Sequence, residues 1–152
     1  ATLDNAIDSL FTKYQPNTIL TLGPDGGYGH PDHRVVSNIV TEVFQKKASD
    51  TIQQLLYFGL PNEYIKEWEK LNNRVAGWIK NSYKTTQKRF LTYQIPFNEE
   101  DFKTGKEALF CAKSQFIPEI MDEIMNTFSP KEKVIYFRPW NGSNGIKTSV
   151  FD

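Results

Sequence analysis

Residues 18–44 read TILTLGPDGGYGHPDHRVVSNIVTEVF and contain three successive patterns that decide the fold. Thr18–Leu22 is short, apolar and partly β-branched, which is typical of a buried strand. Gly23–His33 is a polar run that holds four glycines and both histidines of the chain. Apolar residues then recur at helical spacing from Val35 to Phe44, so an amphipathic helix is predicted. A strand, a glycine-rich loop and a helix follow one another, and the role of the loop is the main question.

The same kind of patterning continues on both sides of this unit. Further helices are predicted at Asp4–Tyr14 with Asp4 as N-cap, from Asn98 to about Phe116, and at Pro118–Phe128. Further strands are predicted at Thr51–Leu60, Phe90–Phe97 and Lys133–Trp140. Residues 62–83 are polar and rich in Trp, Lys and Asn, which favours helical turns and loop. Alternating helices and strands predict a layered α/β fold with a mainly parallel sheet.

The composition is that of one globular domain spanning residues 1–152. Hydrophobic residues make up 39% and charged residues 24%, a balance that excludes a disordered chain. Lys plus Arg and Asp plus Glu both total 18, so charge gives no reason to expect nucleic acid or an anionic membrane as partner. No apolar run approaches the ~18 residues of a membrane span.

Cysteine usage and the start of the chain bear on location. Cys111 is the only cysteine, so no intrachain disulfide can form, and its apolar neighbours predict a packed side chain. No signal peptide is visible at the start of the sequence. A cytoplasmic location is therefore predicted.

The position of the loop indicates a ligand site. In open parallel sheets, ligands bind beyond the carboxyl ends of strands, where the loop leads to the next helix. Pro31 suits the first turn of that helix. The positive end of the helix favours the neutral, metal-binding form of His33. His30 can face the same cleft, and Asp32 between them can orient a ring, as carboxylates beside metal-ligating histidines do.

Taken alone, these residues leave three interpretations open. The run could be a polar turn with a helix cap, and Pro-Asp-Gly around Asp25 favours a turn there. A phosphate-binding loop is a second possibility, although neither GxxxxGK[ST] nor GxGxxG is present. A catalytic metal site is the third, but two histidines and one carboxylate fall short of the usual three protein ligands and their supporting groups.

A family resemblance narrows the choice. The run TILTLGPDGGYGHPDHRVVSNIV resembles the second motif, GHPDH, of the LmbE-like deacetylases, which include the N-acetylglucosaminyl-phosphatidylinositol (PIG-L) de-N-acetylases. Residues 95–116, IPFNEEDFKTGKEALFCAKSQF, are similar to a later strand and helix of that family. The resemblance implies a Rossmann-like fold, a Zn²⁺ cofactor and hydrolysis of the N-acetyl group of a glucosamine-containing substrate.

The resemblance also implies a role for each residue of the motif. His33 would be a zinc ligand, and His30 would stabilise the oxyanion or act as an acid toward the departing amine. Asp32 would orient His30, and Tyr28 would polarise the acetyl carbonyl, although a loop tyrosine can also simply pack. Such groups suit amide hydrolysis, because a metal polarises the carbonyl while a hydrogen-bond donor meets the developing negative charge.

One departure from the family pattern is as informative as the match. Members carry an earlier motif, close to AHPDDE, that supplies the other zinc ligands and the general base. Both histidines of this chain already lie in GHPDH, so no such motif exists here. The chain therefore looks like the C-terminal portion of a deacetylase domain that lacks its N-terminal βα units. The expected partner is the missing upstream segment or a separate chain, and the alternative function is a non-catalytic carbohydrate-binding or structural remnant.

Aromatic and basic residues outside the motif are weaker candidates. Trp68, Trp78 and Tyr83 could form a lid that stacks on a sugar, or they could stud an ordinary surface helix. Arg138 and Trp140 come at the end of the last predicted strand, where a parallel sheet would place substrate contacts.

Overall fold

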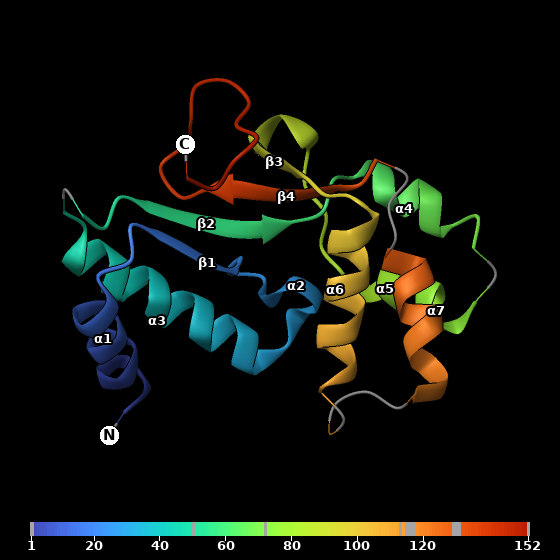
Figure 1. Ribbon diagram of the computed structural model, residues 1–152, viewed down its shortest axis with the longest axis horizontal. Coiled ribbons are helices and arrows are strands. Elements are labelled where there is room, and N and C mark those ends of the chain that lie inside the picture. Colours follow the sequence, from blue (N-terminus) through green and yellow to red (C-terminus); the bar gives the residue numbers. More distant parts are fainter. Residues whose placement is uncertain are drawn as a thin grey trace.

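The computed structural model describes residues 2–49, 51–71, 73–112, 114, 118–128 and 132–151, which form a layered α/β structure (Figure 1). The elements, in chain order, are α1 (Leu3–Tyr14), β1 (Thr18–Leu22), α2 (Gly26–Gly29), α3 (Pro31–Lys47), β2 (Gln54–Gly59), α4 (Glu63–Trp68), α5 (Arg74–Ser82), the 3-10 turn η1 (Lys88–Phe90), β3 (Tyr93–Pro96), α6 (Glu99–Phe110), α7 (Pro118–Phe128) and β4 (Val134–Pro139). The predicted α/β class is confirmed.

Local signals placed most of these elements correctly. The strand predicted at Thr18–Leu22 and the helix predicted at Pro118–Phe128 have those bounds in the structure. Asp4 is not an N-cap as predicted, because Thr2 holds that position and Asp4 lies in the first turn of α1. Helix α6 starts as predicted, with the Asn98 side chain accepting hydrogen bonds from two backbone amides of the first turn. It ends at Phe110, before the predicted end.

The sheet is mixed, which corrects the prediction of a mainly parallel one. Its order is β1-β2-β4-β3. Strands β1 and β2 are parallel, joined through α3, whereas β4 runs antiparallel to both β2 and β3. The reason is that α6 and α7 lie beyond the carboxyl ends of β1 and β2, so the chain enters β4 from that end and runs in the opposite direction (Figure 1).

Two hydrophobic clusters hold the layers together. The first lies between one face of the β1–β2 pair and helices α1 and α3, and is made of Phe11, Val40, Val43, Phe44, Ile52, Leu55 and Tyr57. The second lies among α4, α5 and the end of β2, and is made of Leu60, Trp68, Val75, Ala76 and Ile79. Burying such side chains stabilises each cluster by about 1.5–3 kcal/mol per large residue. The first cluster fixes α3 against β1, and the second fixes α5 beside the ends of the strands.

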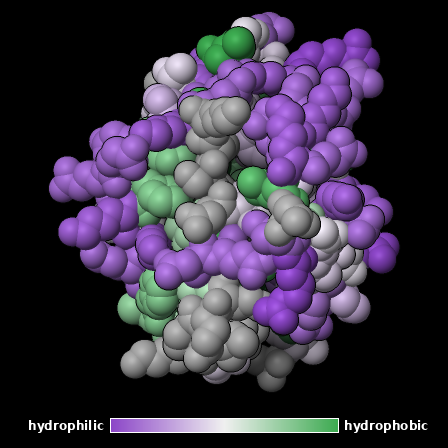
Figure 2. Space-filling view, turned by 90° about the vertical axis from the view of Figure 1, so that its right-hand side faces the viewer, coloured by the Kyte–Doolittle hydropathy of each residue, from purple (hydrophilic) through white to green (hydrophobic). Residues whose placement is uncertain are grey.

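Strands β1 and β2 both run toward α2 and the helices α4–α7 (Figure 1). The face that these helices present is mostly hydrophilic, with smaller hydrophobic patches between them (Figure 2). Within the part of the chain that the structure describes, no helix is both long and apolar enough to cross a membrane.

Candidate active site

The loop after β1 is shaped by glycines in backbone conformations that other residues avoid. Gly26, Gly27 and Gly29 have φ values of 70°, 73° and 84°, in the left-handed region that costs other residues about 1–2 kcal/mol. The Gly26 amide donates to the Gly23 carbonyl at 2.8 Å. The Asp25 carboxylate accepts from the Gly27 amide at 3.0 Å, which confirms the turn predicted at Asp25. The two bonds fold the loop back on itself before α3 begins.

The start of α3 is fixed by its cap and by a bond to β1. His30 is the N-cap and Pro31 occupies the first turn, where a missing N–H leaves no bond unmade. The Arg34 amide donates to the His30 carbonyl at 3.1 Å. One turn later the fully buried Ser37 donates to the Leu22 carbonyl at 2.7 Å. The helix is thereby held to the carboxyl end of the strand, and both histidines lie beyond that end.

The ring of His30 accepts a hydrogen bond at one nitrogen. Its Nδ1 lies 3.3 Å from the backbone nitrogen of Asp32, which donates to it. A nitrogen that accepts carries no proton, so the neutral ring has its proton on Nε2. The contact runs through the backbone of Asp32, whose side chain is exposed. His30 is thus held as a donor at Nε2.

The ring of His33 is held the opposite way. Its Nδ1 lies 3.2 Å from the Gly26 carbonyl oxygen. Because a carbonyl oxygen can only accept, Nδ1 must carry the proton, and Nε2 of the neutral ring keeps its lone pair. A ring that donates from one nitrogen to a backbone carbonyl is the usual arrangement of a metal-binding histidine. The two histidines therefore offer different chemistry within one loop.

Tyr28 lies at the centre of a group of rings. Its centroid is 5.7 Å from that of His30 and 5.1 Å from that of His33, and the two imidazoles are 4.9 Å apart. On its other side Tyr28 contacts Trp78 at 5.2 Å and Tyr83 at 5.5 Å. We call Tyr28, Trp78 and Tyr83 the aromatic platform. The three predicted motif residues His30, His33 and Tyr28 are thus brought together.

The aromatic residues of the predicted lid separate into two groups. Trp68 is 3% exposed and donates from its indole nitrogen to the Thr127 carbonyl, so it belongs to the core. Trp78 is 49% exposed beside Tyr28. Burial raises the pKa of Tyr83 to about 12, with a smaller contribution from Tyr28. Local patterning could not separate these residues, because the burial of Trp68 depends on the packing of α4 against α7, and the place of Trp78 depends on the packing of α5 against the loop.

A backbone hydrogen bond fastens the platform to the loop. The Lys84 amide, just after α5, donates to the Gly27 carbonyl at 3.1 Å. Sequence reasoning missed this contact, since it joins distant segments through main-chain atoms and has no residue signature.

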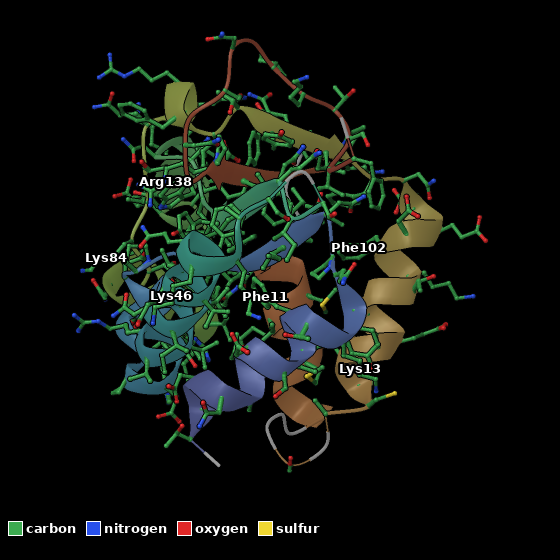
Figure 3. The ribbon with its side chains drawn as sticks, turned by 90° about the vertical axis from the view of Figure 1, so that its left-hand side faces the viewer. Phe11, Lys13, Lys46, Lys84, Phe102 and Arg138 are labelled. Carbon is green, nitrogen blue, oxygen red and sulfur yellow. The ribbon has the colours of Figure 1, made fainter. Side chains whose placement is uncertain are left out.

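A cleft lies beside the loop, and Tyr83 of the aromatic platform is part of its lining. Its lining includes Gly23 and Asp25 from the loop, Lys84, and Arg138 from β4, and the last two lie on the same flank of the molecule (Figure 3). The Arg138 guanidinium also sits over the Tyr57 ring at 5.4 Å.

Trp140 does not join this cleft, which contradicts its predicted place beside the site. Its amide donates to the Leu55 carbonyl near the start of β2, and its ring packs on Phe44 at 5.5 Å. Because β4 is antiparallel to β2, the last residues of β4 lie near the start of β2, whereas the glycine-rich loop lies beyond the carboxyl ends of β1 and β2.

Cys111 is exposed, which makes the prediction of a packed thiol wrong, since it follows the last residue of α6 and does not enter the core.

Among the described residues, no group of three His, Cys, Asp or Glu side chains could hold a metal ion. Nε2 of the neutral His33 ring keeps its lone pair, but the described residues by themselves do not complete a metal site.

Comparison with known proteins bears on this loop directly. Residues 1–44 match the family model of PIG-L, described as GlcNAc-PI de-N-acetylase, and this range includes the loop and both histidines. The predicted resemblance to the PIG-L family is confirmed. A relative from Corynebacterium diphtheriae, named 1D-myo-inositol 2-acetamido-2-deoxy-alpha-D-glucopyranoside deacetylase, is 49% identical over 79 residues, which is 49% of this chain. A relative of the same name from Corynebacterium glutamicum is 26% identical over 110 residues, or 70% of this chain.

These relatives are much longer than the part that matches. The aligned regions cover 26% of the Corynebacterium diphtheriae protein and 35% of the Corynebacterium glutamicum protein. The chain thus spans about a quarter to a third of the length of the curated relatives it matches.

Proposed function

We propose that this chain forms part of an amino-sugar N-deacetylase, a hydrolase that cleaves the amide C–N bond of an N-acetylglucosamine-type group and releases acetate. The observation that carries the proposal is the opposite hydrogen bonding of the two histidine rings, at the Asp32 amide and the Gly26 carbonyl. Amide hydrolysis needs both an electrophilic centre at the carbonyl and a donor for the charge that develops. The names of the relatives indicate the substrate class.

Each residue of the loop has a distinct role in this proposal. His33 would hold a zinc ion through Nε2, and the ion would supply polarisation of the acetyl carbonyl and acidification of water. His30 donates from Nε2 to the oxygen that becomes negative, or to the nitrogen of the departing amine. The Tyr28 hydroxyl donates to the acetyl carbonyl, and Asp32 helps to orient His30. A water oxygen forms a bond to the acetyl carbon and the C–N bond breaks, so the acetyl group leaves as acetate. The amine nitrogen takes up a proton, which the Nε2–H of His30 supplies when it acts as the acid.

The other metal ligands and the general base belong to another part of the same domain. We propose that the chain is the C-terminal portion of a deacetylase domain and that an upstream segment or a partner chain completes the site. The absence of a three-residue cluster among the described residues supports this. A cytoplasmic location stays a prediction.

Two single substitutions test the roles in the complete protein. His33→Ala should remove both zinc and acetate release. His30→Ala should leave zinc bound while the turnover number falls by roughly 10²–10³, the typical effect of losing one oxyanion donor. Zinc content by mass spectrometry and acetate release would be measured on both variants. Loss of zinc from the His30 variant would show that the two roles are wrongly divided.

A second candidate function is a carbohydrate-binding or structural remnant without catalysis, and the incomplete ligand set favours it. The two candidates differ in one measurement. Combining the chain with a separately made upstream segment should produce acetate release if the chain is part of an enzyme. Sugar binding without any acetate release would support the remnant.

A further inference from the structure

We propose that the exposed indole of Trp78 is a stacking surface for the amino-sugar ring, so that the aromatic platform binds the C–H face of the substrate. This inference rests on the proposed function and extends it to a residue outside the motif. Trp78 belongs to α5, and its centroid lies 5.2 Å from that of Tyr28. Tyr28 in turn lies 5.1 Å from the ring of His33.

The first step is the exposure of Trp78. Helix α5 buries Val75, Ala76 and Ile79 in the second core cluster, whereas Trp78 on the border of that face is 49% exposed. An indole removes a large apolar area from water when it is covered, and large apolar side chains left exposed together mark binding surfaces. Trp78 thus remains available to a ligand.

The second step is the fixed orientation of the indole. Its ring contacts Tyr28 and also Tyr83, which lies 6.0 Å away at an interplanar angle of 88°. The hydrogen bond from the Lys84 amide to Gly27 holds the end of α5 to the loop. A ring that is already held loses little conformational entropy when a ligand stacks on it, so the free energy of binding is reduced less by the cost of ordering the side chain.

The third step is chemical complementarity. An aromatic face is electron-rich, and one side of a pyranose presents polarised C–H bonds while its hydroxyls point outward at the rim. The two ring-contact distances place Trp78 at most about 10 Å from His33. That span suits one sugar ring whose acetamide group reaches the histidines. The platform therefore selects a sugar by its ring, and the loop acts on its acetamide.

The test uses ligand-observed NMR on this chain without metal, with methyl N-acetylglucosaminide as probe. Stacking should shift the ring protons of the sugar upfield as they approach the indole. Trp78→Ala should weaken binding by roughly three- to tenfold, the equivalent of one aromatic contact. Trp78→Phe should keep most of the affinity. Trp140→Ala is the matched control, because Trp140 is 43% exposed but lies at the other end of the sheet.

A further variant separates stacking from packing. Trp78→Leu keeps bulk against Tyr28 but has no aromatic face, so it should abolish the upfield shift while the melting temperature stays near that of the unaltered chain. Methyl glucoside, which lacks the acetamide, should lose affinity in Trp78→Ala by a similar factor, because the proposed contact is to the ring.

Several results would overturn the inference. These are no saturable binding by the unaltered chain, equal affinity in Trp78→Ala, or an equal loss in Trp140→Ala. Failure of the proposed function gives a different result, in which the sugar binds through Trp78 but the complete protein releases no acetate. Conversely, acetate release with an unchanged KM in Trp78→Ala would refute the stacking surface and leave the deacetylase proposal intact.

Discussion

Gly26 offers a direct test of how the loop holds His33. Its φ is 70°, and a Cβ built there would lie 2.7 Å from Cγ of Arg34, 3.1 Å from the Arg34 backbone nitrogen and 3.3 Å from Cβ of His33. The contact with the Arg34 side chain is cheap to relieve, because that side chain is flexible. The contacts with the α3 backbone and with His33 are not, since the helix is fixed by its cap and by the buried Ser37.

The magnitude follows from two terms. A non-glycine residue in the left-handed region costs about 1–2 kcal/mol, and forcing atoms into a packed backbone costs about 1–3 kcal/mol. Gly26→Ala should therefore lower the free energy of unfolding by about 2–5 kcal/mol, which corresponds to roughly 4–20 °C in melting temperature for a chain of this size. Gly29→Ala and Gly142→Ala are matched controls, since each has a positive φ and no atom within 4 Å of the added Cβ. They should show the first term alone.

Two measurements decide the outcome. Urea unfolding of the three variants gives the stability differences, and ¹⁵N NMR of the imidazoles gives the protonated nitrogen of each histidine. Gly26→Ala should displace the Gly26 carbonyl and perturb the Nδ1–H signal of His33, while both controls leave it unchanged. If Gly26→Ala costs no more than Gly142→Ala, the close approach of loop and helix does not exist and the geometry assigned to His33 fails with it.

Three other outcomes are expected. An unfolded tyrosine ionises near pH 10, whereas the pKa of Tyr83 in the folded chain is raised to about 12. Between about pH 10 and 12 the unfolded chain therefore binds fewer protons than the folded one, and the free energy of unfolding should fall by about 2–3 kcal/mol as pH rises. The fall should be less steep in Tyr83→Phe. Ser37→Ala should cost about 1–2 kcal/mol in urea unfolding, because the Leu22 carbonyl loses its buried donor. Ser9→Ala is the control and should cost less, since the Ser9 hydroxyl makes the same kind of bond to the Asn5 carbonyl at an exposed position. Leu20, 50% exposed on the edge strand β1, should promote self-association, and Leu20→Lys should reduce it in analytical ultracentrifugation; unchanged association would place the contact elsewhere.

Elements with strong local signals were predictable, and those that depend on the path of the chain were not. Thr18–Leu22 was found at its predicted bounds because a short apolar, β-branched run between breakers has few alternatives. The direction of β4 has no local signal, since VIYFRP forms a strand equally well in either orientation. The wrong prediction that Trp140 lies beside the site followed from assuming that β4 is parallel.

The candidate site divides in the same way. His30, His33 and Tyr28 belong to one short stretch, so a single motif brought them together before any fold was known. The hydrogen-bond partners that give the histidines opposite protonation lie in the backbone, at Asp32 and Gly26, and no side-chain pattern records them. Trp78 reaches Tyr28 only through the packing of α5 on the loop.

The hydrogen bond between the backbones of Lys84 and Gly27 makes the segment after α5 and the glycine-rich loop move together. A displacement of the chain after α5 shifts Gly27 and, with it, the neighbouring Gly26, whose carbonyl accepts the hydrogen bond from His33. Motion of the aromatic platform and reorientation of that imidazole are therefore coupled through main-chain atoms. An insertion or deletion between residues 82 and 86 would change the geometry of the histidines as surely as a substitution in the loop. Substitution of the exposed Lys84 side chain should be tolerated, whereas a shift of the Lys84 backbone should not be.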